Sequence, residues 1–166
     1  MTLQAARIEL LQRMPFFGGI RADAIETLLD HARTVRVPAQ GFFFREGDPG
    51  DSMFVLESGA VRVLKGWRGQ DYELHRFGVG DCFGEMSLMD LGPRSASVRA
   101  VEACSAIELG ADDLLRLFER DVEQFALIQM NMGREVCRRL RATDELLFRA
   151  GNGETVPEAQ ALVPST

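Results

Sequence analysis

Between residues 33 and 110 the sequence alternates short strand-like runs with glycines, and this spacing restricts the fold more than any other feature. The runs are rich in β-branched and aromatic residues: "TVRV", "GFFFRE", "DSMFVLES", "GAVRVLKG", "DYELHRF" and "SASVRAVE". Glycines lie among them at positions 41, 47, 50, 59, 66, 69, 78 and 80. Short strands about 8–12 residues apart, separated by turn signals, are typical of an antiparallel sandwich or barrel. We therefore expect residues 33–110 to form a β-roll.

Helical patterns lie on both sides of this region. Apolar residues recur at helical spacing in 1–32, which we expect to hold a helix ending near Met14 and a second one over about 22–32. Residues 111–150 continue as a short helix and a long one over about 122–148. The predicted fold class is α+β: an antiparallel β-roll (a jelly-roll-like double-stranded β-helix) flanked by N-terminal helices and a long C-terminal helix. We expect one domain, 1–150, and a disordered tail, 151–166.

Composition and charge bound the class of protein. The 166 residues suffice for one well-buried domain, and the formal net charge of −6 gives the chain no overall attraction to a phosphate backbone. We therefore expect no direct nucleic-acid binding. No apolar stretch is long enough for a signal peptide core or a membrane span, which favours a cytoplasmic protein without membrane contact. The three cysteines include no CxxC pair and are expected to be reduced thiols.

Two turns are predicted within the first half of the glycine series. "EGDPGDS" indicates a Pro-Gly turn between two strands. "ESGA" indicates a tight turn in which Gly59 supplies a positive φ. We expect the strands on either side of Gly59 to form a hairpin.

The stretch "FGEMSLMDLGPRSASV", residues 83–98, combines groups suited to a nucleotide. We expect a short helix over 85–91, preceded by Gly84, whose unpaired N–H groups and partial positive charge suit an anion. The planar guanidinium of Arg94 can bind a phosphate through two parallel hydrogen bonds. The Glu85 carboxylate only accepts hydrogen bonds, so it suits sugar hydroxyls rather than a phosphate. This pattern favours a ligand with one ribose and one phosphate.

The stretch resembles the phosphate-binding cassette of cyclic nucleotide-binding domains, whose pattern is roughly F-G-E-x-[AS]-L-x(4)-P-R-[ASTC]-A-[STQV]. The match includes the family's interval between the glutamate and the arginine. The resemblance extends from "MPFFGGI" through "FREGDPGDSMFVLESGAVRV" to "REVCRRLRATDELL". It implies that Glu85 binds the ribose 2′-OH, that Arg94 binds the phosphate, and that Gly84, Ser95 and Ala96 supply further donors. The expected ligand-binding residues are Phe83, Gly84, Glu85, Met86, Ser87, Arg94, Ser95, Ala96, Thr143 and Asp144.

The last two of these residues come from the long helix. In the family this helix covers the base, and Thr143 aligns with a threonine that faces adenine in the bacterial catabolite activator. Asp144 replaces a serine of that relative and can accept from adenine N6 or from guanine N1 and N2. We expect cAMP as the ligand, with cGMP as the alternative, and no cofactor.

Other function classes fit the sequence less well. The only histidines, His31 and His75, lie on different predicted elements, so no metal site is expected. The chain also lacks a G-x-S-x-G elbow and a P-loop, so we expect no enzyme. Residues 150–166 are too few and too poor in basic residues for a helix-turn-helix. We expect a stand-alone receptor that signals to a protein partner; the alternatives are a cyclic-dinucleotide module, a ligand-free scaffold, or a fragment of a transcription regulator.

The long helix, 122–148, carries two further patterns. Arg134, Arg138, Arg139 and Arg141 are expected to form a solvated face paired with glutamates at short helical spacing. The apolar stripe can pack wholly on the roll or be shared with a second chain. Because relatives that dimerise do so through this helix, we expect a homodimer.

Overall fold

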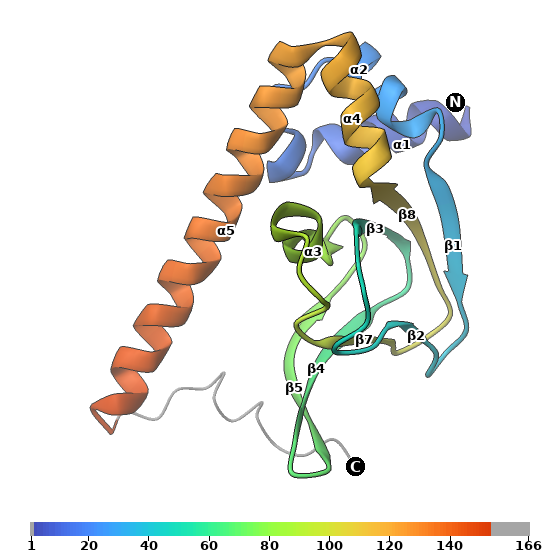
Figure 1. Cartoon of the computed structure of the whole chain (residues 1–166). Helices are drawn as coiled ribbons and strands as arrows, with labels where there is room; N and C mark the ends of the chain where they lie inside the picture. Colours follow the sequence, from blue (N-terminus) through green and yellow to red (C-terminus); the bar gives the residue numbers. More distant parts are fainter. Residues whose placement is uncertain (1, 154–166) are drawn as a thin grey trace.

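The structure, a computed structural model that describes residues 2–153, is a β-roll with helices packed at one end (Figure 1). The helices are α1 (Leu3–Gln12), the 3₁₀ helix η1 (Pro15–Phe17), α2 (Ala22–Leu29), α3 (Glu85–Asp90), α4 (Ala111–Arg120) and α5 (Val122–Gly151). The strands are β1 (Arg33–Val37), β2 (Phe42–Phe44), β3 (Ser52–Ser58), β4 (Val61–Trp67), β5 (Gln70–Phe77), β6 (Cys82–Phe83), β7 (Ser97–Ala100) and β8 (Cys104–Gly110). The predicted α+β class, with a roll flanked by helices, is confirmed.

The strands form two antiparallel sheets, in the orders β1-β8-β3-β6 and β2-β7-β4-β5. The predicted hairpin around Gly59 is wrong, because β3 pairs with β6 and β8 whereas β4 pairs with β5 and β7. At Gly59 the chain crosses from one sheet to the other. Its φ is +85°, and a Cβ there would lie 2.7 Å from both Ala103 O and Cys104 Sγ. Gly59 therefore permits both the crossing and its close packing.

The interior of the roll is lined by side chains from both sheets. Phenylalanines dominate the end near the cassette: the rings of Phe54 and Phe83 stack at 5.4 Å, and Phe43 meets both edge-on. Aromatic pairs in these arrangements add to the stabilisation that burial alone provides. The ring cluster fixes β6, and with it the start of the cassette.

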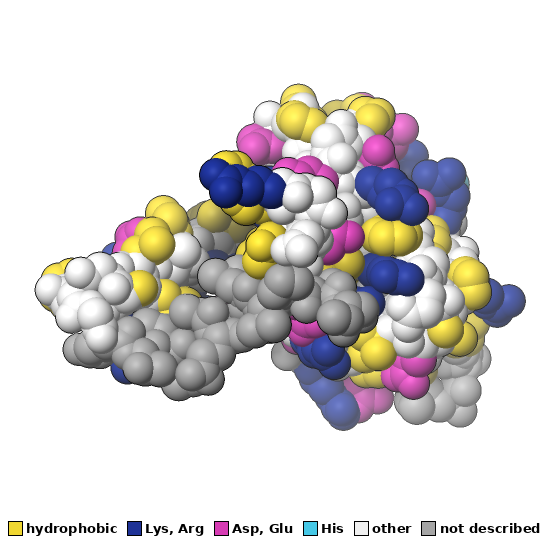
Figure 2. All heavy atoms as spheres, turned by 90° about the horizontal axis from the view of Figure 1, so that it is seen from below, with side chains coloured by type: hydrophobic (Ala, Val, Ile, Leu, Met, Phe, Trp, Pro, Cys, Tyr) yellow, Lys and Arg dark blue, Asp and Glu magenta, His cyan; other side chains and the backbone are white. Residues whose placement is uncertain are grey.

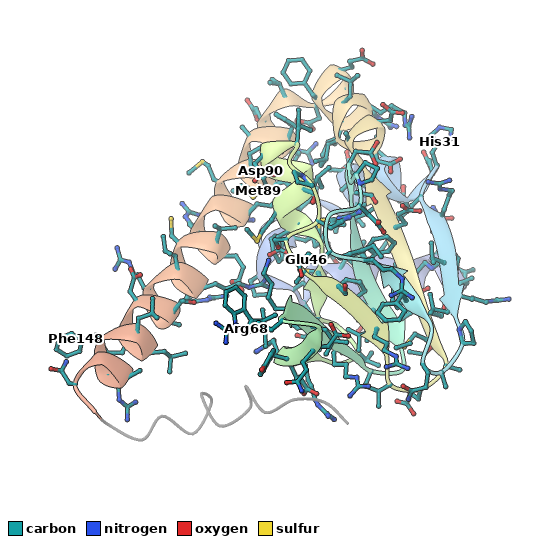
Figure 3. All side chains as sticks on the ribbon, turned by 60° about the horizontal axis from the view of Figure 1, so that its bottom comes forward. His31, Glu46, Arg68, Met89, Asp90 and Phe148 are labelled. Carbon is teal, nitrogen blue, oxygen red and sulfur yellow. The ribbon has the colours of Figure 1, made fainter. Side chains whose placement is uncertain are left out.

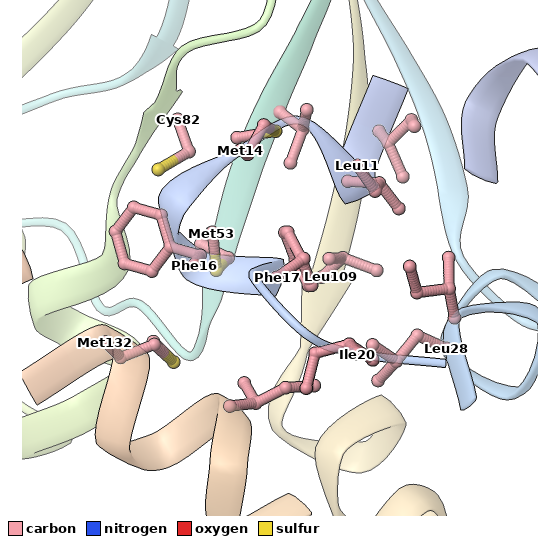
Figure 4. Close-up of a cluster of buried hydrophobic side chains, with 14 of the residues drawn as sticks. Leu11, Met14, Phe16, Phe17, Ile20, Leu28, Met53, Cys82, Leu109 and Met132 are labelled. Atoms are coloured by element: carbon pink, nitrogen blue, oxygen red, sulfur yellow. The ribbon is translucent and has the colours of Figure 1, made fainter. Parts of the chain in front are cut away.

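A second core joins the helices to the end of the roll (Figure 4). Phe16 and Phe17 of η1 are 2% exposed and pack with residues of the sheet and of α5. Pro15 begins this 3₁₀ turn, a position where its missing N–H costs little. Because proline disfavours helical backbone in the residue before it, α1 ends ahead of it, at Gln12. α2 ends at Leu29, three residues before the predicted limit. The helices are thus anchored to the roll near the place where α5 begins.

The two halves of α5 differ in their surroundings. The first half is buried through Ile128 and Met132, and the Asn131 amide donates to Phe16 O at 3.1 Å and Gly18 O at 2.9 Å. The second half projects from the roll in Figure 1 and lies in the lobe at the left of Figure 2, and Leu147 is 67% exposed. The helix runs to Gly151 rather than the predicted 148. Of the predicted tail, 154–166 lie outside the described residues.

Candidate functional site

The cassette, residues 83–98, folds as β6, α3 and the start of β7, with left-handed backbone at both ends of α3. Gly84 has a φ of +83°, and a Cβ there would lie 2.8 Å from Arg94 Nη1 and 3.3 Å from Ser52 O. Glycine is therefore favoured at position 84 for two reasons: the backbone has a positive φ, and there is no room for a Cβ. Leu91 ends α3 at a φ of +56°, in the left-handed region that usually favours glycine. These two turns bring the two ends of the cassette together.

Arg94 is 5% exposed and points into the roll. Its Nη1 donates to Ser52 O at 2.6 Å and to Gly84 O at 3.0 Å, and its Nη2 donates to Ser52 Oγ at 3.1 Å. The guanidinium carbon lies 4.2 Å from the ring centroid of Phe44. Burial lowers the pKa of Arg94, which nearby carboxylates such as Asp51 partly oppose. The arginine is therefore held as a cation in a fixed orientation.

One donor of Arg94 stays unused. Its Nε is buried and, among residues 2–153, has no hydrogen-bond partner. A buried donor without an acceptor costs free energy, which an incoming acceptor would recover. The loop before β3 packs closely against this side of the guanidinium, because a Cβ at Gly50 would fall 2.3 Å from Nε. Glycine at position 50 therefore permits the observed position of the one nitrogen of Arg94 that lacks an acceptor.

The same loop is tied to the backbone of Arg94. Gly47 N donates to Arg94 O at 2.8 Å, and Arg94 N donates to Asp48 O at 2.8 Å. The Asp48 carboxylate also accepts from Arg45 N at 2.8 Å, which closes the turn. The residues of the predicted Pro-Gly turn therefore hold the backbone of Arg94 in place.

Glu85 is also 5% exposed, and a residue of α5 pairs with it. Arg139 Nη1 lies 2.6 Å from Glu85 Oε1, and Arg139 Nε donates to Glu135 Oε1 at 3.1 Å. In Figures 1 and 3, α3 lies between α5 and the roll, with the labelled Met89 and Asp90 on its last turn. This ion pair joins the cassette directly to the long helix.

Arg139 and Phe77 are site residues that sequence reasoning missed. The expectation of a solvated face at Arg139 is wrong, because its guanidinium carbon lies 5.6 Å from the centroid of the Phe77 ring and its side chain pairs with Glu85. His75 meets the Phe77 ring edge-on at 4.6 Å. The sequence signal for Arg139 is its position one helical turn before the predicted ligand residue Thr143, which places it on the same side of α5 but does not identify Glu85 as its partner.

The structure gathers most predicted ligand residues but separates two of them. Phe83, Ser87 and Ala96 are buried around Glu85 and Arg94. Met86 and Ser95 are exposed beside them, and Ser95 Oγ lies 3.7 Å from Met86 Sδ. Thr143 and Asp144 are exposed on the projecting half of α5. Contact of these two residues with a ligand stays a prediction.

Neither a candidate metal cluster nor a candidate membrane span occurs in residues 2–153. No group of three or more His, Cys, Asp or Glu side chains there is arranged to hold a metal ion. None of the described helices is both long and apolar enough to cross a membrane.

Burial raises the pKa of the Cys82 thiol, and the nearby charge of Glu85 is the next cause of this shift.

The comparisons with known proteins agree with this geometry. The family model described as cyclic nucleotide-binding domain matches residues 34–121, more than half of the chain. The chain therefore belongs to the cyclic nucleotide-binding domain family, as the cassette resemblance predicted. A solved cyclic nucleotide-binding domain from Methylobacillus flagellatus has a TM-score of 0.76 at 25% identity, covering 88% of this chain and 83% of that one.

Two curated relatives are similar in sequence. The cyclic AMP receptor protein of Thermus thermophilus is 34% identical over 131 residues, which are 78% of this chain and 59% of that protein. The cAMP-dependent protein kinase regulatory subunit of Emericella nidulans is 34% identical over 107 residues, 64% of this chain and 26% of that protein. The chain spans less than two thirds of the length of these relatives.

Proposed function

We propose that this chain is a receptor module that binds a cyclic mononucleotide between the roll and α5, without catalytic activity. The observation that carries the proposal is the pair of buried, oppositely charged groups at the two ends of the cassette. Arg94 keeps a buried donor free, and Glu85 offers carboxylate oxygens one residue after a glycine that Arg94 also contacts. A phosphodiester next to a ribose satisfies both groups at once.

Cyclic AMP is the proposed ligand, and cGMP is the second candidate. The support comes from the two relatives named above, which are a cyclic AMP receptor protein and a cAMP-dependent kinase subunit. Asp144 does not distinguish the two ligands, because its carboxylate accepts from the amino groups of either purine. We propose that Thr143 and Asp144 reach the base when α5 moves toward the roll.

The proposed output is a change in the position of α5 that an effector protein recognises. Arg139 connects the two parts, because its partner Glu85 is also the proposed acceptor for the ribose hydroxyl. A ligand hydroxyl that donates to Glu85 either replaces Arg139 at the carboxylate or binds beside it. In both cases the contact between the cassette and α5 changes. Only differential contacts of this kind let a ligand shift a conformational equilibrium.

We also propose that the exposed face of α5 supports a homodimer. Large apolar side chains are exposed along it, with Met130 at 54%, Leu140 at 58% and Phe148 at 67%. A depression of about 610 Å³ lies on the same helix beside Cys137. Exposed apolar surface on a helix is typical of contacts between chains. Sedimentation of the whole chain with and without cAMP would test this assembly; a monomer at all concentrations contradicts it.

A thermal-shift panel of cAMP, cGMP and cyclic di-GMP tests the nucleotide assignment. A ligand at a hundred times its Kd adds about 2.7 kcal/mol to stability, which raises the Tm of a domain this size by about 5–10 °C. We expect the largest shift with cAMP. A larger shift with cyclic di-GMP contradicts the mononucleotide assignment, and no shift with any of them indicates a scaffolding module.

The role of Glu85 is tested separately with 2′-deoxy-cAMP. Glu85→Gln keeps the shape but weakens the acceptor, so the variant should lose most of the preference for cAMP over its 2′-deoxy analogue. Hydrogen bonds to charged groups contribute about 1.5–3 kcal/mol, so the expected loss of discrimination is about tenfold. Equal discrimination by both proteins, measured by calorimetry, counts against the ribose assignment.

A further inference from the structure

The sheet of β2, β7, β4 and β5 carries three arginines in one line. Arg62 of β4 lies directly opposite Arg99 of β7 on one side and Arg76 of β5 on the other. We call Arg62, Arg76 and Arg99 the arginine row. Neighbouring strands lie about 4.8 Å apart, so the row extends about 10 Å across the sheet.

The arginine row faces away from the interior of the roll. The residues next to it along the strands, namely Val61, Phe77, Val98 and Ala100, belong to the core of the roll or pack against it. Because successive side chains of a strand point to opposite faces, the three guanidinium groups project outward. The row is therefore separate from the proposed nucleotide site between the roll and α5, and an inference about it does not rest on the proposed function.

One carboxylate and one backbone carbonyl partly offset the three charges of the row. Glu73 pairs through both carboxylate oxygens with Arg76, at 3.1 Å from Nη2 and also with Nε, and Gln40 O accepts from Arg99 Nε at 3.0 Å. The Nε of Arg62 is buried and, in residues 2–153, has no hydrogen-bond partner. Like charges directly opposite one another destabilise a sheet. The fold thus keeps concentrated positive charge and an unused donor on a chain whose net charge is −6.

An aromatic residue continues the row on the next strand. Phe42 of β2 lies opposite Arg99, and its ring centroid is 3.9 Å from the guanidinium carbon of Arg45 and 5.4 Å from that of Arg99. Cation–π contacts of this kind hold guanidinium groups in place at a surface. The outer face therefore presents positioned cations beside apolar surface.

We propose that the arginine row and Phe42 form a docking surface for an extended acidic segment of a partner protein. Alternate side chains of an extended chain lie about 7 Å apart on one face, so two carboxylates reach across the row. Each carboxylate can accept two parallel hydrogen bonds from one guanidinium. A short acidic segment brings two carboxylates to the row and little further charge, so the net charge of −6 opposes it less than it opposes a long polyphosphate.

The test uses the whole chain and a fluorescent heptapeptide in which glutamate and threonine alternate. Anisotropy measures its binding, and a peptide with lysine in place of glutamate is the control. Arg62→Gln, Arg76→Gln and Arg99→Gln should each weaken binding about twofold to fivefold, the range for exposed ion pairs. The triple Gln variant should weaken it at least about tenfold. The matched control is Arg36→Gln, which removes an exposed arginine from the other sheet and should change affinity less than about twofold.

Two further measurements separate docking from folding and from the nucleotide site. The triple Gln variant should keep its Tm, because the opposed cations are gone, and its response to cAMP should equal that of the unchanged chain. A triple Lys variant keeps the charge but loses the planar fork, so it should recover only part of the affinity. Equal peptide affinity of the triple Gln variant and the unchanged chain overturns the proposal. An equal loss in Arg36→Gln, or tighter binding of single-stranded DNA or anionic vesicles than of the peptide, also overturns it.

Discussion

Glu85 and Arg94 are buried to the same extent, 5% exposed each, but different parts of the molecule hold them. Arg94 is fixed within the roll by Ser52 and by a backbone carbonyl of the cassette. Glu85 is held from outside the roll by Arg139 of α5. The orientation of the arginine is therefore set by elements that the roll itself fixes. The glutamate depends on where α5 lies.

This difference separates affinity from response. A phosphate that binds Arg94 needs no rearrangement of the long helix, because loop, strand and cassette already position the guanidinium. A group that binds Glu85 acts on the contact between cassette and α5. Substitutions at the two ends of the cassette should therefore affect different measurements.

The largest expected effect is on affinity at Arg94. Arg94→Ala removes the charged donors, so cAMP binding should weaken about tenfold to a hundredfold. Arg94→Lys should also weaken it, since an ammonium group cannot reproduce the planar fork. Calorimetry measures both, and urea unfolding shows whether each variant is folded. Unchanged affinity in a folded Arg94→Ala variant contradicts the phosphate role.

Arg139→Ala tests the other side of the comparison. It leaves the Glu85 carboxylate buried without its cation, and the fold should lose about 1–2 kcal/mol, less than for a fully buried pair because the Arg139 side chain is 36% exposed. Hydrogen exchange in the second half of α5 should rise. The control is Arg138→Ala, whose partner Glu135 lies on the same helix, with an expected change below about 0.5 kcal/mol. Equal losses in the two variants would show that Arg139 does not link α5 to the cassette.

Gly50→Ala tests the position of the Arg94 guanidinium with a smaller change than Arg94→Ala. The added Cβ would lie 2.3 Å from Arg94 Nε, so the guanidinium must shift, and we expect cAMP affinity to fall about fivefold. Gly78→Ala is the control, because nothing lies within 4 Å of a Cβ there. A normal affinity in Gly50→Ala would mean that the position of Nε does not matter for binding.

The smallest expected effect concerns the base of α5. Asp121 caps the helix, and the N–H of Gln124 together with Arg21 lowers the pKa of its carboxyl. A lowered folded pKa means that this stabilisation is present above the ordinary aspartate range, near pH 4, and is lost as pH falls through the folded pKa. Asp121→Asn keeps a cap that does not titrate. Its Tm should therefore fall less between pH 5 and pH 3 than that of the unchanged chain; equal falls would contradict this assignment.

The sequence predicted the parts of the molecule that depend on local patterns. Strand-and-glycine spacing was sufficient for the roll, and the cassette was predicted from the resemblance of residues 83–98 to the family's pattern. The hairpin at Gly59 was wrong because the turn signal is local, whereas the partner of β3 is β8, about fifty residues away along the chain. Arg139 was assigned to a solvated face because helical spacing pairs it with Glu135, and only the tertiary fold brings Glu85 to its other side.

The long helix, an unbroken 30 residues from Val122 to Gly151, would act as a lever if it tilted at its base. Its fulcrum lies near Met132, the last of its fully buried residues, and Phe148 lies 16 positions farther on, about 24 Å at the usual helical rise. A tilt of about 5° at the fulcrum would therefore carry the far end through about 2 Å. A tilt too small to disturb the packing at the base would in this way be enough to displace the far end of α5.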